Sequence, residues 1–134
     1  MKTFRIIALV LCASFMLTAC GGGTPESVAE GYVKAYIDVD YKKAASYATK
    51  EYSGEIMEIA ELIKSDEMKE IVEGRKNELK GIKYKVTDID VDEEIGEATV
   101  RFEFTLKDER TEEGRVDLIK EDGAWKVENE RIHF

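Results

Sequence analysis

Residues 98–106 read ATVRFEFTL, and no other stretch of the chain has so regular a pattern. Apolar and polar residues alternate along it without a break, with apolar side chains at Ala98, Val100, Phe102, Phe104 and Leu106. Successive side chains of a β-strand point to opposite faces, so this alternation predicts a strand with one buried and one solvated face. The strand therefore belongs to a sheet that is covered on one side.

The residues before this strand predict a partner strand that contains a bulge. Apolar residues recur at Ile82, Tyr84 and Val86 and, after a change of phase, at Ile89 and Val91. A change of phase by one residue predicts a β-bulge, here near Thr87 and Asp88. Residues 94–97 then form the turn between the two strands.

The residues after it predict two more strands. Residues 111–114 are expected to turn the chain back, and a third strand follows at residues 116–119. Residues 121–123 read Glu-Asp-Gly, which is a signal for a tight turn, and Trp125 opens the fourth strand. Four successive strands with short connections predict an antiparallel meander.

The part of the chain before the sheet predicts helices. Thr24 is a good N-cap and Pro25 suits the first helical position, so a helix begins there and runs to about Asp38. Asp40 can cap a second, shorter helix whose apolar residues recur at helical spacing as far as Ala48.

A third helical region begins at Ser53 and continues towards residue 80. Its pattern leaves open whether residues 54–80 form one helix or two helices with a joint near Ser65. Helices followed by a meander predict an α+β domain, in which N-terminal helices pack on one face of a strongly curved, four-stranded antiparallel sheet.

Three stretches of the domain resemble the NTF2-like, or cystatin-like, superfamily. They are the opening stretch 24–29 with Tyr32 and Tyr36, the start of the second helix at 40–45, and the closing stretch 122–127. The chain resembles in particular the small domains of bacterial lipoproteins described as DUF4878. This resemblance spans residues 25–130 and implies a cone between helices and sheet, which relatives use for catalysis with an Asp, Tyr and His set or for binding a ligand.

The N-terminus has the order of regions of a secretory signal peptide. Lys2 and Arg5 precede an uncharged apolar run, residues 6–19, which at 14 residues is short for a membrane-spanning helix of roughly 20 residues. Residues 17–20 read Leu-Thr-Ala-Cys and resemble the lipobox of bacterial lipoproteins, in which the cysteine receives a diacylglycerol and the chain is cut before it. An ordinary signal peptide is the alternative.

These observations predict three segments. Residues 1–19 are the signal peptide, residues 20–24 the lipidated N-terminus with its glycine tether, and residues 25–134 an NTF2-like domain. Acyl chains on Cys20 would hold the domain at a membrane of the cell envelope, because two chains suffice for stable anchoring. Since residue 21 is not aspartate, the resemblance implies the outer membrane where a bacterium has two.

The charge of the mature chain excludes several classes of partner. Without Lys2 and Arg5 it has 18 basic and 29 acidic residues, a net charge of −11. This charge repels the phosphates of nucleic acids and anionic lipid headgroups, so nucleic acid is not an expected partner. The membrane is therefore expected to be reached through the lipid on Cys20, and not through the surface of the domain.

The residues that usually carry catalysis or bind metals are scarce. His133 is the only histidine and is expected to be solvated near the end of a strand, and no cofactor is expected. The Asp88, Asp90 and Asp92 series invites a calcium interpretation, yet its spacing lacks the glycine and the bidentate glutamate of an EF-hand loop. These aspartates are expected on the solvated face of the strand.

Six aromatic residues are candidates for lining a ligand pocket on the concave side of the sheet: Tyr32, Tyr36, Tyr47, Phe102, Phe104 and Trp125. Their spacing suits a closed core equally well, and the predicted inward positions of the strands carry almost no polar group. We therefore expect a non-catalytic binding or accessory module for an envelope protein or a small ligand. A small enzyme or ligand carrier that uses the cone is the alternative, and a homodimer through the sheet face stays open.

Overall fold

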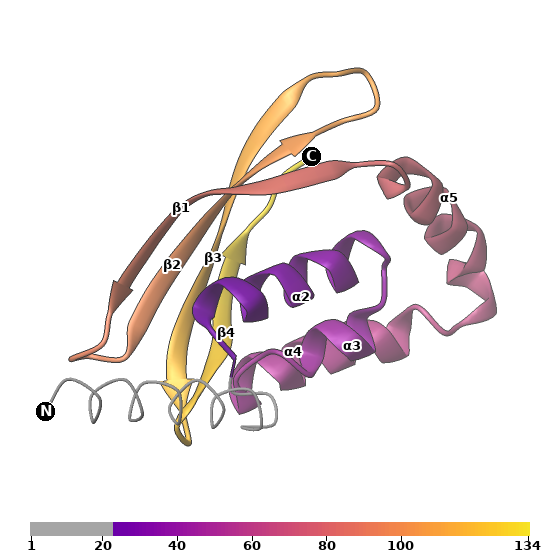
Figure 1. Cartoon of the computed structure of the whole chain (residues 1–134). Helices are drawn as coiled ribbons and strands as arrows, with labels where there is room; N and C mark the ends of the chain where they lie inside the picture. Colours follow the sequence, from indigo (N-terminus) through magenta and orange to yellow (C-terminus); the bar gives the residue numbers. More distant parts are fainter. Residues whose placement is uncertain (1–22) are drawn as a thin grey trace, which may run out of the picture.

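The computed structural model describes residues 23–134, whose four strands form one antiparallel sheet in the order in which they occur in the chain. The strands are β1 (Lys83–Asp92), β2 (Glu97–Thr105), β3 (Thr111–Glu121) and β4 (Ala124–Arg131). The sheet curves around helices that lie on its concave side (Figure 1). The predicted α+β fold, with helices packed on a four-stranded meander, is therefore confirmed.

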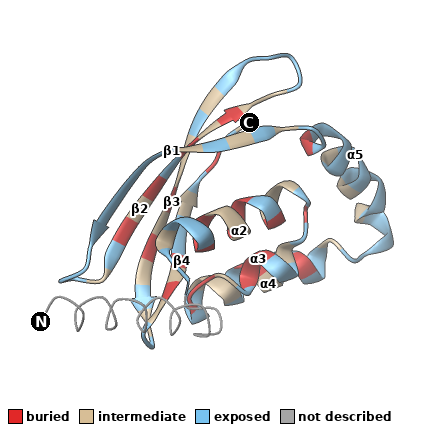
Figure 2. Cartoon of the chain, viewed as in Figure 1, coloured by how far each residue is buried: buried red, intermediate tan, exposed pale blue. Residues whose placement is uncertain are grey.

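Helix α2 (Pro25–Ile37) lies across the concave face of the sheet, and its residues that face the sheet are buried (Figure 2). Its start is the predicted one. The Thr24 hydroxyl accepts a hydrogen bond from the Ser27 N–H at 3.1 Å, and the Ser27 hydroxyl accepts one from the Thr24 N–H at 3.0 Å. This reciprocal capping satisfies backbone donors that have no partner within the helix.

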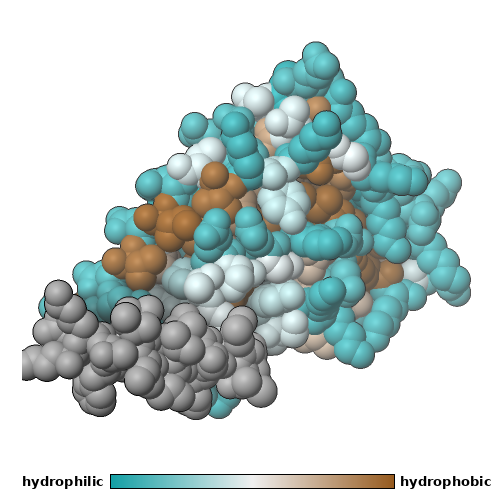
Figure 3. Space-filling model, viewed as in Figure 1, coloured by the Kyte–Doolittle hydropathy of each residue, from teal (hydrophilic) through white to brown (hydrophobic). Residues whose placement is uncertain are grey.

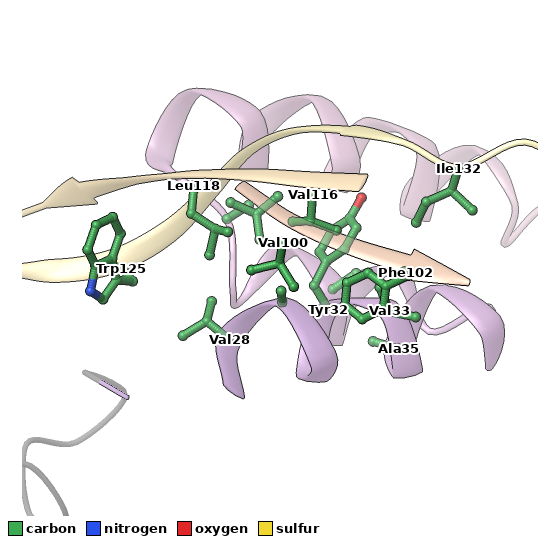
Figure 4. Packing of buried hydrophobic residues seen from close by; sticks show 14 of the residues in the cluster. Val28, Tyr32, Val33, Ala35, Val100, Phe102, Val116, Leu118, Trp125 and Ile132 are labelled. Carbon is green, nitrogen blue, oxygen red and sulfur yellow. The ribbon is translucent and has the colours of Figure 1, made fainter. Parts of the chain in front are cut away.

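The hydrophobic core lies between α2 and the inward positions of β2, β3 and β4 (Figure 4). The largest side chains that are completely buried there are Phe102, Phe104, Leu118, Val33, Val100, Val116 and Val127. The inward positions of β2 and β3 agree with the alternation of the sequence. The strict pattern of residues 98–106 therefore marks the centre of the core.

Helix α2 ends in a turn that places a valine in the left-handed region. Val39 has φ 56°, its N–H donates to the Tyr36 carbonyl at 3.1 Å, and the Asp40 N–H donates to the Ala35 carbonyl at 2.9 Å. These two bonds form a Schellman motif, in which glycine is the usual residue at the left-handed position. The turn directs the chain into α3 (Tyr41–Ala45), which Asp40 caps as predicted.

The second and third helices differ from their predicted bounds. α3 ends at Ala45 rather than near Ala48, because the chain leaves the helix to pair with β4: the Val127 N–H donates to the Tyr47 carbonyl, and the Thr49 N–H donates to the Val127 carbonyl, both at 2.9 Å. Thr49 then caps α4 (Lys50–Leu62), which begins three residues before the predicted Ser53.

The region left open by the sequence consists of two helices. Ser65 has an extended backbone, and a 3-10 turn at Asp66–Met68 leads into α5 (Lys69–Leu79). Figure 1 shows α5 standing beside the end of the sheet from which β1 begins, away from α4. No helix within residues 23–134 is long and apolar enough to cross a membrane.

The sheet contains two irregularities in register, and one of its turns lies elsewhere than predicted. The register of β1 and β2 shifts between Val86 and Asp88, which confirms the predicted bulge. The prediction of a turn at residues 111–114 is wrong, because these residues belong to β3 and the turn lies at residues 107–110. Gly114 lies within β3 and not in a turn. A Cβ at this position would lie 2.7 Å from Cε2 of Phe104, so glycine leaves room for the Phe104 ring. The second irregularity, between β3 and β4, determines the candidate site.

Candidate functional site at the open end of the cone

A bulge in β4 turns a carboxylate towards the concave side of the sheet. Asp117 pairs with Asn129 and Leu118 with Val127, so Glu128 is the extra residue on β4. Trp125 and Val127 face the core before the bulge, and Glu130 and Ile132 do so after it. Bulges often re-aim a side chain in this way beside functional sites.

Glu130 is an acid in an apolar setting. It pairs across the sheet with Val116, which has no exposed surface, and its Oε2 atom is buried without a hydrogen-bond partner. Burial raises the pKa of this carboxyl, and the Ile132 N–H and the charge of His133 offset only part of that effect. The site therefore makes the charged form of Glu130 less favourable than that of an exposed glutamate.

Three tyrosines lie near enough to Glu130 for its charge to affect the pKa of their phenols. The Tyr32 and Tyr52 hydroxyls lie 3.3 Å apart, and the ring of Tyr32 is 6.4 Å from the rings of both Tyr36 and Tyr52. Burial is the main cause that raises the pKa of all three phenols, and the nearby Glu130 charge raises each further. We call Glu130, Tyr32, Tyr36 and Tyr52 the acid–tyrosine cluster.

A groove of about 540 Å³ lies next to this cluster, between α5 and the turn from β2 to β3. We call it the cone-end groove. Its apolar lining comes from Leu79, Ile82, Leu106 and Phe134, and its polar rim includes Arg75 and Lys107. The volume lies within the range of small-molecule sites, which are mostly apolar with a few polar groups.

Two side chains connect the cone-end groove with the acid–tyrosine cluster. Phe134 lines the groove and contacts the edge of the Tyr36 ring at 6.5 Å and that of Phe104 at 5.0 Å, measured between ring centroids. Arg75 also lines the groove and pairs with Glu78 at 3.2 Å. It lies close enough to Tyr36 to lower the pKa of the Tyr36 phenol, although burial raises that pKa by more. A ligand in the groove would therefore lie one side chain away from the cluster.

A second groove, of about 480 Å³, lies on the other side of Ile82. It contains Lys34, Lys76 and Lys80, so its rim is more polar than that of the cone-end groove. Because the cone-end groove combines an apolar lining with a position one side chain away from the acid–tyrosine cluster, it is the better candidate for a small ligand.

The structure divides the six predicted pocket residues into three groups. Tyr32, Phe102, Phe104 and Trp125 are buried in the core, where Figure 4 shows Tyr32 and Phe102 between α2 and the sheet. Tyr36 is half-buried beside Phe134.

Tyr47 is half-buried against the core and packs on Gly31 of α2. The predicted lipidation site Cys20 lies outside the described residues.

The other candidates of the sequence are exposed. His133 is on the surface, as are Asp88, Asp90 and Asp92. Asp92 instead supports the turn from β1 to β2, because its carboxylate accepts hydrogen bonds from the N–H groups of Glu94 and Ile95 at 3.1 and 3.3 Å.

Sequence reasoning missed Glu130, Tyr52 and Arg75. The apolar residues Trp125 and Val127 are two positions apart, but the next one, Ile132, follows after five. An odd spacing within a strand is the signal of a bulge, and it could have placed Glu130 on the inner face. Tyr52 and Arg75 have no comparable signal, because only the packing of α4 and α5 places them.

Comparisons with known proteins find one family match and two structural neighbours. The model of the family DUF4878, a domain of unknown function, matches residues 18–128. A crystal structure of a candidate NTF2-like transpeptidase from Campylobacter jejuni has a TM-score of 0.58 at 20% identity, and the match covers 80% of this chain and 99% of that one. A SEC-C motif containing protein from Rhodopseudomonas palustris has a TM-score of 0.45 at 14% identity, with 76% and 73% covered. No curated protein matches the chain.

Proposed function

This chain belongs to the DUF4878 family and has an NTF2-like fold, and on that basis we propose that it is a lipid-anchored envelope protein whose domain binds a small ligand without chemical conversion. The proposed ligand site is the cone-end groove. The proposed anchor is the acylated sulfur of Cys20.

The observation that carries the binding role is an apolar groove with basic side chains at its rim, one side chain away from the acid–tyrosine cluster. Leu79, Ile82 and Leu106 offer apolar contacts, while Arg75 and Lys107 offer hydrogen-bond donors at the rim of the groove. A ligand of matching character would have an apolar body and one or more oxygen acceptors. Such sites derive specificity from a few polar groups in an apolar surround.

The apolar fluorescent anion 8-anilinonaphthalene-1-sulfonate tests the groove. We expect the methyl NMR signals of Ile82 and Leu106 to shift when this probe is added to the native chain. Gly74 lines the groove, and a Cβ there meets nothing within 4 Å, so Gly74→Trp should fill the groove and abolish these shifts.

Gly54→Trp on α4 is the matched control, since its Cβ also meets nothing within 4 Å. It should leave the shifts unchanged. Methyl signals that do not respond to millimolar probe would exclude the cone-end groove as a binding site.

The proposal of a lipid anchor rests on residues 17–20 and on the apolar run before them. Mass spectrometry of the native chain should find an N-terminal Cys20 that carries diacylglycerol, and Cys20→Ala should release the domain from the membrane fraction. A free thiol at position 20, or a chain that begins upstream of it, would contradict the anchor but not the ligand site.

The acid–tyrosine cluster favours a second candidate function, an enzyme that uses general acid–base catalysis. A carboxyl whose pKa is raised by burial, with phenols nearby, can act as a general acid or base towards a bound substrate. The native chain would then catalyse the exchange of activated C–H protons of small ketones with D₂O, and Glu130→Gln would abolish it. Binding of ligands without any exchange favours the non-catalytic role.

A further inference from the structure

The second half of β1 is a sheet edge that the helices do not cover. β1 is the first strand in the sheet order and pairs with β2 alone, so within residues 23–134 no strand pairs with its outer side. Every second residue of an edge strand directs its backbone N–H and C=O groups outwards, where another strand can pair with them. We call residues 88–92 of β1, together with Ile95 in the following turn, the β1 edge surface.

Apolar side chains are exposed on this surface. Ile89, Val91 and Ile95 are 40%, 39% and 64% exposed, whereas Val100 and Ala98, the partners of Ile89 and Val91 on β2, are 0% and 5% exposed. The helices therefore cover the inward side chains of β2 but leave those of the second half of β1 exposed. Figure 3 shows a strip of apolar surface that follows this part of β1.

Aspartates alternate with these apolar residues. Asp88, Asp90 and Asp92 are exposed on the other face of the strand, and Asp92 lies directly opposite Glu97. A second copy that paired along the same edge would bring aspartates next to aspartates, which is destabilising. The charges thus oppose self-association and favour a strand with basic side chains.

We infer that the β1 edge surface binds an extended segment of a partner protein in which lysine or arginine alternates with valine or isoleucine. The segment adds to the sheet as a fifth strand beside β1. Its apolar side chains cover Ile89 and Val91, and its basic side chains lie beside Asp88 and Asp90. Backbone hydrogen bonds supply affinity in such strand addition, and the alternate side chains supply specificity. This inference goes beyond the proposed binding of a small ligand, and it does not involve the cone-end groove.

A capped peptide of sequence KVKVKVK tests the inference on the native chain. We expect binding that weakens as salt increases, together with slower hydrogen exchange of β1 backbone amides. Asp88→Asn combined with Asp90→Asn should weaken binding at least tenfold. Glu103→Gln with Glu113→Gln removes the same charge from β2 and β3 and should leave the affinity unchanged.

A peptide of the same composition in the order KKKKVVV separates strand addition from general attraction to an acidic protein. Equal affinity for both peptides, or no protection of β1 amides, would overturn the inference. Protection of β1 that grows with protein concentration in the absence of peptide would instead show a second copy as the occupant and also overturn it. Response of Ile82 and Leu106 to 8-anilinonaphthalene-1-sulfonate in the same sample reports separately on the groove.

Discussion

Glu130 shows how one residue can acquire a role that its neighbours in sequence conceal. It follows Glu128 and Asn129 in a polar stretch that resembles a solvated strand end. The bulge at Glu128 reverses its orientation, and the core then excludes water from Oε2. Because desolvation disfavours the charged form, the fold makes Glu130 a weaker acid than an exposed glutamate.

The raised pKa of Glu130 predicts how stability depends on pH. The folded state binds this proton more tightly than the unfolded state, so the contribution to stability is fully present below the ordinary pKa of 4.5 and is lost as pH rises through the higher folded pKa. Glu130→Gln has no carboxyl to ionise at this position, so its stability does not fall with pH for this reason. Urea unfolding should show that the variant is more stable than the native chain at pH 7, by on the order of 1 kcal/mol.

At pH 4 the two proteins should differ much less, since the native carboxyl is then protonated in both states. Parallel stability curves for the two proteins between pH 4 and pH 8 would contradict the assignment of Glu130 as a desolvated acid.

The hydrogen bond between Tyr32 and Tyr52 predicts an asymmetric pair of variants. Tyr32 is only 3% exposed, whereas Tyr52 is half-buried and borders a surface groove. Tyr52→Phe therefore leaves a buried hydroxyl without a partner and should cost about 1–3 kcal/mol, while Tyr32→Phe should cost about 1 kcal/mol or less.

The double variant provides the check on this explanation. Removing both hydroxyls leaves no unsatisfied group, so the double variant should be more stable than Tyr52→Phe alone in thermal or urea unfolding. A double variant whose loss equals the sum of the single losses would show that the hydroxyls do not interact.

Among the helices, α2 and the segment after α3 meet at a glycine. A Cβ on Gly31 would lie 2.5 Å from Cζ and 2.7 Å from Cε1 of Tyr47. Tyr47 therefore packs directly over the backbone of α2, a position that helical spacing alone does not predict. Close approach of this kind depends on the absence of a side chain at residue 31.

Gly31→Ala should lower stability although alanine is the better helix former. The added methyl forces Tyr47 to move, which we expect to cost on the order of 1 kcal/mol net in urea unfolding. Gly54→Ala in α4 is the matched control: its Cβ meets nothing within 4 Å, and it should stabilise by roughly 0.5–1 kcal/mol. If both variants stabilise the protein equally, Tyr47 does not pack as described.

The helices also show where local signals and long-range contacts compete. Thr24 and Asp40 cap the first two helices as predicted, because a cap acts within a few residues of itself. The sequence predicted an end of α3 near Ala48, but the helix ends at Ala45, because the backbone of Tyr47 and Thr49 pairs with Val127 on β4. That contact joins residues almost eighty positions apart in the chain, so no local pattern contains it.

Across the whole domain, charge is distributed unevenly. Residues 75–85 contain five basic residues and one acidic residue, whereas residues 88–97 contain six acidic residues and no basic one. β1 therefore joins a basic end near the grooves to an acidic end at its turn into β2. The groove rims with Lys34, Arg75 and Lys107 lie at the basic end.

The net charge of −11 for residues 20–134 predicts how the protein meets a membrane. The acylated chain should sediment with vesicles of phosphatidylcholine and with vesicles that also contain phosphatidylglycerol, because two acyl chains suffice for stable anchoring. The Cys20→Ala chain should stay in the supernatant with both kinds of vesicle. An acidic protein surface is not attracted to neutral headgroups and is repelled by anionic ones.

Sedimentation in 0.5 M salt completes this experiment. Screening should not release the acylated chain, because its attachment is hydrophobic. Salt-sensitive binding of the Cys20→Ala chain to anionic vesicles would show instead that the surface of the domain binds lipid.

Local patterning was enough to derive the order of helices and strands and the bulge in β1, because caps, alternation and turn residues act over a few positions. It did not fix the bounds of α3, α4 and β3. The candidate site required the folded chain. Glu130 comes from β4, Tyr32 from α2, Tyr52 from α4 and Arg75 from α5, and the orientation of Glu130 depends on a bulge in the pairing of β3 with β4. A buried acid and a groove arise from packing between distant segments, and the free energy of that packing is not encoded in any single stretch of the chain.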